Sequence, residues 1–238
     1  MAANLKQKIK RGEQVVGFGI RGDIERDAFQ RIAELGACDF VFVDSQHSPY
    51  SEDRLVALAG MIGEFDLPLH FRIKHTRHTY LIGNCLDLGP SGIEVPQVET
   101  VATAEEAVAN FYYLPQGVRS HGGGARVGDT SSGPQAYADW WNQYGVLWLQ
   151  VESVAAATSA FNLARPGVDC LSFGPTDLQM DLNHRGHPHL KSVDDCVRHV
   201  VEALQGTDTA VCFRNGTAES RSRYADMGVR VFLEAPPV

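Results

Sequence analysis

The sequence predicts a (β/α)8 barrel, the TIM-barrel fold, formed by residues 1–238 as one domain with a short N-terminal helix and a truncated C-terminal end. Eight apolar runs of strand length alternate with amphipathic helical runs, which is the first reason. The strand candidates are mostly apolar throughout, as expected for buried parallel strands joined by crossovers. Polar side chains gather where these runs end, and catalytic residues of such barrels lie at the carboxyl ends of the strands.

The first four strand and helix pairs follow a short amphipathic helix at 4–11. Each strand candidate is rich in Val, Ile, Leu or Phe, and each helix candidate repeats apolar residues at helical spacing. Asp23 is expected to cap the first barrel helix, and Gly36 to end it. The predicted pairs are 14–20 with 23–36, 39–44 with a helix that begins at Ser51, 67–74 with 79–88, and 92–98 with 102–113.

A polar, Gly-rich segment at 115–134 interrupts this alternation. Loops of this length inside a compact domain are usually functional or disordered, so we expect a lid over the site. An aromatic helix around Trp140 and Trp141 follows. The remaining predicted pairs are 146–152 with 155–163, 168–177 with 192–204, and 208–214 with 218–227, before an eighth strand at 229–233 with no helix after it.

The composition argues against several classes of function. A formal net charge of -8 without a basic cluster argues against nucleic acid, because binding to its backbone needs concentrated Lys and Arg. Five scattered cysteines without a CxxC pair favour a reducing compartment. Residues 1–10 are too polar for a signal peptide, and no run is long enough to span a membrane. We therefore expect a cytoplasmic protein that acts on small molecules.

Two carboxylates at the ends of consecutive predicted strands indicate a divalent metal. Glu152 ends the fifth strand candidate and Asp177 the sixth, and consecutive strands are neighbours in a barrel. Two acids completed by water and substrate suit Mg²⁺ or Mn²⁺. Either acid alone is as easily explained as a helix cap or a solvated rim residue, but the pair favours a metal. The turn at 174–176 could present backbone N–H groups to an anion.

A second group of candidates follows the second and third predicted strands. Asp44 precedes His47 by three residues and could orient its imidazole as a proton carrier, although a lone histidine is more often structural. Arg72 could hold a carboxylate with its planar guanidinium, or pair with an acid of the barrel. Lys74 alone of the five lysines lies at a strand end, so a Schiff-base mechanism would need it.

Two further polar segments have different interpretations. Arg119 and Arg126 flank a triple glycine that lacks the ending of a phosphate-binding loop, so we expect a flexible cationic flap for a second substrate. The histidines at 184, 187 and 189 stand among Gly and Pro and indicate a surface turn rather than a metal site.

Taken together, these features resemble the HpcH/HpaI aldolase family, metal-dependent pyruvate aldolases built on a phosphoenolpyruvate-binding type of barrel. The resemblance extends from residue 5 to about residue 233. The motifs that carry it are the runs at 40–47, 86–89, 94–99, 117–119, 150–152 and 173–178, together with Arg72.

The resemblance implies a divalent metal, which would be Mg²⁺, Mn²⁺ or Co²⁺, and no organic cofactor. Glu152 and Asp177 would bind this metal. The residues implied to hold or line the pyruvate site are Arg72, Gln150, Gly174, Pro175 and Thr176.

The resemblance also implies proton carriers and a partner. His47 with Asp44 would move protons through a water, and Asp87 would be lent to a neighbouring subunit of a homo-oligomer, a trimer or a hexamer. Gln46 departs from the family pattern, in which a Glu hydrogen-bonds metal-bound water. Lys74 also departs from it, because a small residue or a proline is common there.

The expected function is that of a metal-dependent aldolase, which cleaves a 4-hydroxy-2-oxo acid to pyruvate, or a related 2-oxo acid, and an aldehyde. Arg119, Arg126 and Lys74 would meet the polar tail of the aldehyde. Three alternatives stay open: a Schiff-base aldolase through Lys74, a metal-dependent acyl-CoA lyase or citrate-type synthase, and a barrel that binds an oxo acid without turning it over.

Overall fold

Eight parallel strands close a barrel in chain order, which confirms the predicted fold class. The computed structural model describes residues 4–36, 38–122 and 127–237. All neighbouring strands pair in parallel, including β8 with β1. The strands are β1 (Val15–Ile20), β2 (Phe40–Asp44), β3 (Leu69–Arg72), β4 (Gly92–Val95), β5 (Val146–Val151), β6 (Cys170–Phe173), β7 (Ala210–Gly216) and β8 (Val231–Glu234).

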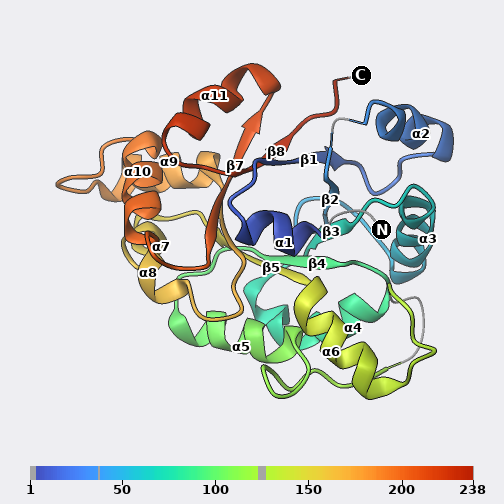
Figure 1. Ribbon diagram of the computed structural model, residues 1–238. Helices are drawn as coiled ribbons and strands as arrows, with labels where there is room; N and C mark the ends of the chain where they lie inside the picture. Colours follow the sequence, from blue (N-terminus) through green and yellow to red (C-terminus); the bar gives the residue numbers. More distant parts are fainter. Residues whose placement is uncertain (1–3, 37, 123–126, 238) are drawn as a thin grey trace.

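The helices surround the strands, and α1 lies inside their ring (Figure 1). In the part of the chain that the structure describes, no helix follows β8. The helices are α1 (Leu5–Lys10), α2 (Arg26–Glu34), α3 (Glu52–Gly63), the 3₁₀ helix η1 (Thr76–Leu81), α4 (Ile82–Asp87), α5 (Val101–Phe111), α6 (Pro134–Tyr144), α7 (Val154–Thr158), α8 (Ala160–Leu163), α9 (Pro175–Arg185), α10 (Val193–Ala203) and α11 (Ala218–Asp226).

The two ends of α2 show which local signals hold. Gly36 follows the helix at φ 60°, the left-handed conformation predicted for its stop. The prediction that Asp23 caps the helix was wrong, because α2 begins at Arg26 after Glu25. The carboxylate of Asp23 accepts hydrogen bonds from the Arg21 guanidinium at 2.8 and 2.7 Å, and not from the first backbone N–H groups of α2.

The sixth strand is shorter than predicted. β6 ends at Phe173, and α9 begins at Pro175, because proline suits the first helical position, where no N–H donor is needed. Asp177 therefore lies in the first turn of a helix that was not predicted.

Two apolar clusters hold the barrel together. One joins the outward faces of the strands to the helices, and the other fills the inside of the barrel from α1 upwards. The inner cluster depends on a close approach: a Cβ at Gly17 would lie 2.1 Å from the Phe40 ring. The inner cluster consists of Leu5, Ile9, Val15, Phe40, Phe42, Val146, Trp148, Cys170, Cys212, Val231 and Leu233.

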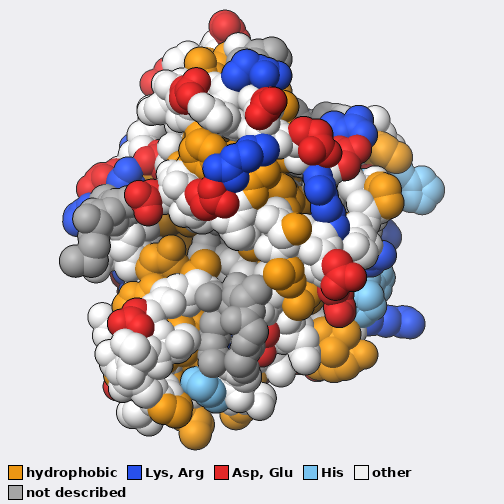
Figure 2. Space-filling model, turned by 90° about the vertical axis from the view of Figure 1, so that its right-hand side faces the viewer, with side chains coloured by type: hydrophobic (Ala, Val, Ile, Leu, Met, Phe, Trp, Pro, Cys, Tyr) orange, Lys and Arg blue, Asp and Glu red, His pale blue; other side chains and the backbone are white. Residues whose placement is uncertain are grey.

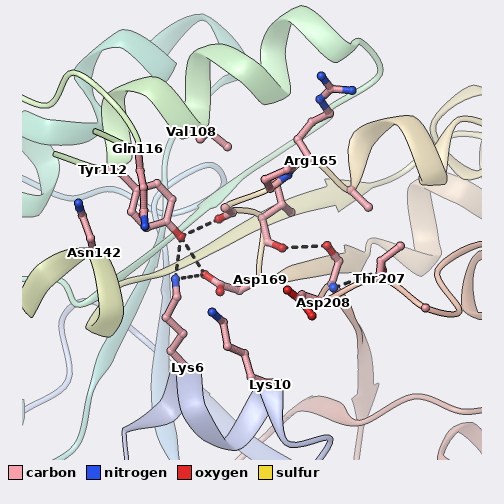
Figure 3. Close-up of a pocket in the computed structure, with 16 residues that line it drawn as sticks. Lys6, Lys10, Val108, Tyr112, Gln116, Asn142, Arg165, Asp169, Thr207 and Asp208 are labelled. Carbon is pink, nitrogen blue, oxygen red and sulfur yellow. Dashed lines mark hydrogen bonds and ion pairs between the residues drawn. The ribbon is translucent and has the colours of Figure 1, made fainter. Parts of the chain in front are cut away.

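A buried lysine fastens α1 to the amino-terminal end of the barrel, which we call the base (Figure 3). The Nζ of Lys6 donates to the Tyr112 hydroxyl at 2.7 Å, to the Gly145 carbonyl at 2.7 Å and to Asp169 Oδ2 at 2.9 Å. Tyr112 in turn donates to the Gly167 carbonyl at 2.6 Å. A cavity of about 530 Å³ opens beside this network. All three N–H donors of the Lys6 ammonium are therefore bonded within the base of the barrel.

The predicted lid at 115–134 is anchored on both sides. The backbone N–H of Val118 donates to the Ala109 carbonyl at 2.6 Å, and that of Arg119 to the Tyr112 carbonyl at 2.9 Å. On the other side, a Cβ at Gly128 would lie 2.4 Å from the ring of Trp140. These fixed ends do not fit a freely hinged flap, and the centre of the segment, including Arg126, lies outside the described residues.

The surface shown in Figure 2 mixes charges of both signs. Lys and Arg side chains are interspersed with Asp and Glu, and hydrophobic side chains occur in small groups between them. The described residues on this face therefore present no continuous basic surface for a nucleic-acid backbone. No helix in the described ranges is long and apolar enough to cross a membrane.

Candidate active site

The carboxyl ends of the strands bring six polar side chains together inside the barrel. Side chains alternate along a strand, so the residue two positions after an inward core residue also points inward. We call this end of the barrel, with Glu152 and Asp177 at its rim, the mouth. The six inward side chains are Asp44, Arg72, Glu94, Gln150, Ser172 and Arg214.

Arg72 is the most connected of these side chains. Its Nε and Nη2 donate to the two carboxylate oxygens of Asp44 at 2.8 and 2.6 Å, and its Nη1 donates to Gln150 Oε1 at 2.9 Å. The carboxylate of Glu94 lies 3.8 Å from its Nε. The structure thus brings three predicted site residues together, and Arg72 pairs with a barrel acid, as one of its two interpretations expected.

The carboxylate of Asp44 binds Arg72 rather than His47. Both carboxylate oxygens bind Arg72, and Oδ1 also accepts the backbone N–H of Gln46 at 2.8 Å. Burial would raise the pKa of Asp44, but the hydrogen bonds from Arg72 prevail and lower it. Among the described residues, no hydrogen bond joins His47 to Asp44, and His47 is exposed. Their action as a pair through water stays a prediction.

Glu152 is a buried carboxylate held by a strained backbone. Only 8% of the residue is exposed, and Oε2 accepts the backbone N–H of Gln97 at 3.0 Å. Gln97 has a backbone φ of 51°, which residues other than glycine rarely adopt. Burial raises the pKa of Glu152 to about 7, with further contributions from the charges of Glu94 and Asp177, although Arg72 opposes the rise.

The turn after β6 lies directly beside Glu152. A Cβ at Gly174 would lie 2.6 Å from Glu152 Oε1 and 2.9 Å from Gln150 Nε2, so a larger residue here would displace these two side chains. Pro175 and Thr176 begin α9, and Asp177 is exposed in its first turn. The predicted pyruvate-holding turn is therefore the N-terminus of a helix, where backbone N–H groups and the helix dipole favour an anion.

The donor set at the rim fits a hard divalent cation. The charge of Asp177 raises the pKa of Glu152, so the two carboxylates are close enough to repel each other. Among the described residues, no cluster of three or more His, Cys, Asp or Glu could enclose a metal. Two carboxylates with places left for water and substrate are the open arrangement typical of Mg²⁺ or Mn²⁺ in enzymes.

Sequence reasoning missed an ion pair that crosses the inside of the barrel. Glu94 is fully buried, accepts the Ser172 hydroxyl at 2.5 Å, and pairs with the guanidinium of Arg214. Each of these side chains is the one polar side chain among the inward positions of its strand. That pattern was the available signal, because an inward charge in a parallel barrel needs a partner on another strand.

The structure places Arg119 in the protein interior, so its predicted role in a mobile flap was wrong. Its side chain is buried, donates to Asp87 Oδ1 at 2.7 Å, and packs over the ring of Trp141 at 4.5 Å. The aromatic helix α6 provides this ring, which holds the guanidinium by a cation–π contact. The same bond gives Asp87 a partner within its own chain.

Lys74 does not continue the inward face of β3. The strand ends at Arg72, and the exposed Lys74 ammonium lies 5.1 Å from the centre of the Tyr50 ring. Tyr50 packs on Phe71, which faces the outer helix layer, so Lys74 lies outside the group of mouth residues. The predicted shared face of Arg72 and Lys74 was therefore wrong. Gln46 does lie at the mouth, and its buried Oε1 has no partner among the described residues.

A family model described as HpcH/HpaI aldolase/citrate lyase matches residues 25–216, a range that includes every mouth residue named above. A hydroxypyruvate/pyruvate aldolase of Delftia acidovorans is 29% identical over 227 residues, which cover 94% of this chain and 83% of that protein. A 5-keto-4-deoxy-D-glucarate aldolase of Shigella boydii is 29% identical over 171 residues, which cover 70% of this chain and 64% of that protein.

Solved structures agree with the barrel. The crystal structure of an HpcH/HpaI aldolase from Desulfitobacterium hafniense matches with a TM-score of 0.83 at 26% identity, and the match covers 97% of this chain and 89% of that one. The similarity extends over nearly the whole chain, so the fold and the family are both supported along its length.

Proposed function

This chain belongs to the HpcH/HpaI aldolase/citrate lyase family, and we propose that it is a metal-dependent aldolase for pyruvate or a related 2-oxo acid. It would add the 2-oxo acid to an aldehyde and cleave the resulting 4-hydroxy-2-oxo acid. The observation that carries the proposal is the pair of acids Glu152 and Asp177 at the mouth beside Arg72, with the pKa of Glu152 raised to about 7 by burial. Related proteins described as aldolases support the reaction class.

The residues at the rim would hold the metal and the oxo acid. Glu152 and Asp177 would bind a divalent cation, which when bound supplies Lewis-acid stabilisation of the oxo group. Arg72, fixed by its bonds to Asp44 and Gln150, would attract the carboxylate of the oxo acid. The N-terminus of α9 would offer backbone N–H groups to the same anion.

Proton transfer would fall to the group at the end of β2. His47 would take a proton from the methyl carbon of pyruvate through a water. That carbon then attacks the aldehyde carbon, a carbon–carbon bond forms, and the former aldehyde oxygen takes up a proton. Asp44 would act on His47 through the same water, because its own oxygens already bind Arg72.

A Schiff-base mechanism is the principal chemical rival. It would need Lys74, whose ammonium lies over Tyr50 and away from the mouth, which supports the metal-dependent route. Borohydride added during turnover with pyruvate traps an imine as a stable adduct. Mass spectrometry is expected to find no adduct on Lys74, and an adduct there would overturn the metal-dependent proposal.

Metal removal tests the proposal directly. Protein treated with a chelator is expected to lose at least about 100-fold of its retro-aldol rate, since a Lewis acid contributes several kcal/mol, and to regain it with Mn²⁺, Mg²⁺ or Co²⁺. An unchanged rate after stripping would contradict the metal role. Exchange of the pyruvate methyl protons is measured in parallel: metal-dependent binding without exchange would indicate a barrel that binds the oxo acid and does not turn it over.

The quaternary structure is a separate proposal. We expect a homo-oligomer, a trimer or a hexamer, in which Asp87 reaches a neighbouring site. Light scattering measures the mass of the particle, and a fully active monomer would contradict this role of Asp87.

A further inference from the structure

Arg214 spans the inside of the barrel at the level of the mouth. Its side chain begins on β7, and its guanidinium carbon lies 4.6 Å from the centre of the Phe42 ring on β2. Its Nη2 donates to Glu94 on β4. Because β8 and β1 separate β7 from β2, the guanidinium lies across the barrel and forms part of the floor of the mouth.

The strand β1, which lies between β8 and β2, has glycine where it passes this guanidinium. Gly19 of β1 is the register partner of Phe42 and lies two positions after Gly17, which faces the ring of Phe40 inside the barrel. A Cβ at Gly19 would meet nothing closer than the backbone oxygen of Glu234, at 3.7 Å. This sector of the mouth therefore contains the Arg214 guanidinium, and no side chain fills the position beside Gly19.

Arg214 has more hydrogen-bond donors than partners. A guanidinium carries five N–H groups, and among the described residues only Nη2 of Arg214 is bonded, while the buried Nε has no partner. The side chain is 20% exposed, although Trp148 and Cys212 in the layer beneath are fully buried. The exposed part therefore faces the mouth. Arg119 also has unpartnered buried nitrogens, but its side chain is closed off, whereas that of Arg214 is partly open to the mouth, so its free donors can reach an acceptor that arrives with a ligand.

We propose that Arg214 selects the aldehyde, and that it binds a carboxylate on that second substrate beside Gly19. This inference rests on the proposed aldolase function. Arg72 is already held on both sides by Asp44 and Gln150, in the sector of β2 to β5. Arg214 enters from the other side of the barrel, and its planar donors match a carboxylate. The protein thus prefers short aldehydes that carry a negative charge.

The test compares charged and neutral aldehydes of equal length in one enzyme. Pyruvate is combined with succinic semialdehyde or butanal, and with glyoxylate or glycolaldehyde, and kcat/KM is measured for each aldehyde. Arg214→Met is expected to lower the charged-to-neutral ratio of kcat/KM by about 30-fold, as a charge-assisted hydrogen bond predicts, mainly through KM. Arg214→Lys keeps the charge and is expected to restore part of the ratio. The matched control is Arg230→Met, an exposed arginine before β8.

A second variant protects the test against misfolding. Arg214→Met leaves Glu94 buried without its cation, so Arg214→Met combined with Glu94→Gln removes both charges together. Equal losses with charged and neutral aldehydes in both variants would show a purely structural role and overturn the inference. An unchanged ratio would also overturn it.

The two proposals fail in different ways. If the wild-type protein adds pyruvate to none of the four aldehydes, the aldolase function is wrong and the inference falls with it. If the wild-type protein is active and the variants keep its ratio, only the role of Arg214 is wrong.

Discussion

The two ends of the barrel contain buried charges in opposite conditions. At the base, Lys6 has three acceptors within 2.9 Å, and the carboxylate of Asp169 also receives the backbone N–H of Leu147 at 2.8 Å. At the mouth, Arg214 and Gln46 have buried polar atoms without partners among the described residues. The base therefore satisfies its buried cation within the protein, whereas the mouth leaves polar atoms unpartnered where a ligand could reach them.

The balance of charge differs in the same way. One cation faces one carboxylate at the base, and the two remain close because each would be costly to bury alone. At the mouth, Glu94, Glu152 and Asp177 lie near one another, and burial together with this crowding raises the pKa of Glu152. The base therefore needs nothing further, while the rim gains from a cation.

The largest expected effect comes from the rim. Glu152→Gln keeps the shape of the side chain but removes the charge that would bind the metal, so turnover is expected to fall at least about 1000-fold, a barrier increase of roughly 4 kcal/mol. Circular dichroism is expected to show the barrel intact. Glu99→Gln is the control, because Glu99 is an exposed acid in the β4–α5 loop, which also contains the Gln97 that bonds to Glu152. Substantial turnover by Glu152→Gln would show that the rim does not need this carboxylate to bind a metal, and the proposed difference between rim and base would be wrong.

The base is tested by Lys6→Met. Removing the cation leaves Asp169 buried and unpaired, so the free energy of unfolding is expected to fall by about 3–5 kcal/mol, measured by urea denaturation. Lys8→Met in the same helix breaks a partly exposed pair with Asp39 and is expected to lower it by less than about 1 kcal/mol. Similar losses of unfolding free energy for both variants would show that the buried Lys6 network stabilises the protein no more than the partly exposed Lys8 pair does. Combining Lys6→Met with Asp169→Asn is expected to recover part of the loss.

The raised pKa of Glu152 predicts a pH dependence of stability for the metal-free protein. Its folded pKa of about 7 exceeds the unfolded value of about 4.3, so between these pH values the folded state binds the proton more tightly. Stability from this group is therefore present below about pH 4 and lost as pH rises towards 7. Glu152→Gln is expected to unfold at a free energy about 1–3 kcal/mol higher than wild type at pH 8, with no such gain at pH 4. A constant difference across the range would refute the assignment.

The smallest expected effect concerns backbone strain at the rim. Gln97→Gly removes the penalty of a left-handed residue at φ 51° and is expected to raise stability by about 0.5–1 kcal/mol. Asp66 near the base also lies at φ 55°, but Asp tolerates this conformation, so Asp66→Gly is expected to gain less. Thermal unfolding of both variants makes the comparison. A larger gain in stability for Asp66→Gly than for Gln97→Gly would show that the greater strain lies near the base and not at the rim.

The sequence predicted the mouth better than the connections around it. Asp44, Arg72, Gln150 and Glu152 were placed correctly near the carboxyl ends of strands, because strand length and alternation follow from local apolar patterns. Arg119 was misplaced because its burial depends on Trp141, which arrives from a later helix. Local pattern does not encode such a contact.

The pair of Glu94 and Arg214 was missed for a related reason. The two residues lie 120 positions apart in the sequence, and they meet only because the barrel closes. The prediction for Lys74 was wrong for a different reason. It continued the inward and outward alternation of β3 past Arg72, where the strand ends. Inward direction is predictable inside a strand, whereas pairing across the barrel and the path of a loop require the closed fold.

The docking of α1 also has a consequence for the order of folding. The hydrogen-bond partners of Lys6 lie 106, 139 and 163 residues further along the chain. The helix made first during synthesis must therefore wait for β5 and β6 before its ammonium has anywhere to bind, and contacts of such sequence separation form slowly. We expect the amides of α1 to gain protection late in a hydrogen-exchange refolding experiment, after those of the central strands.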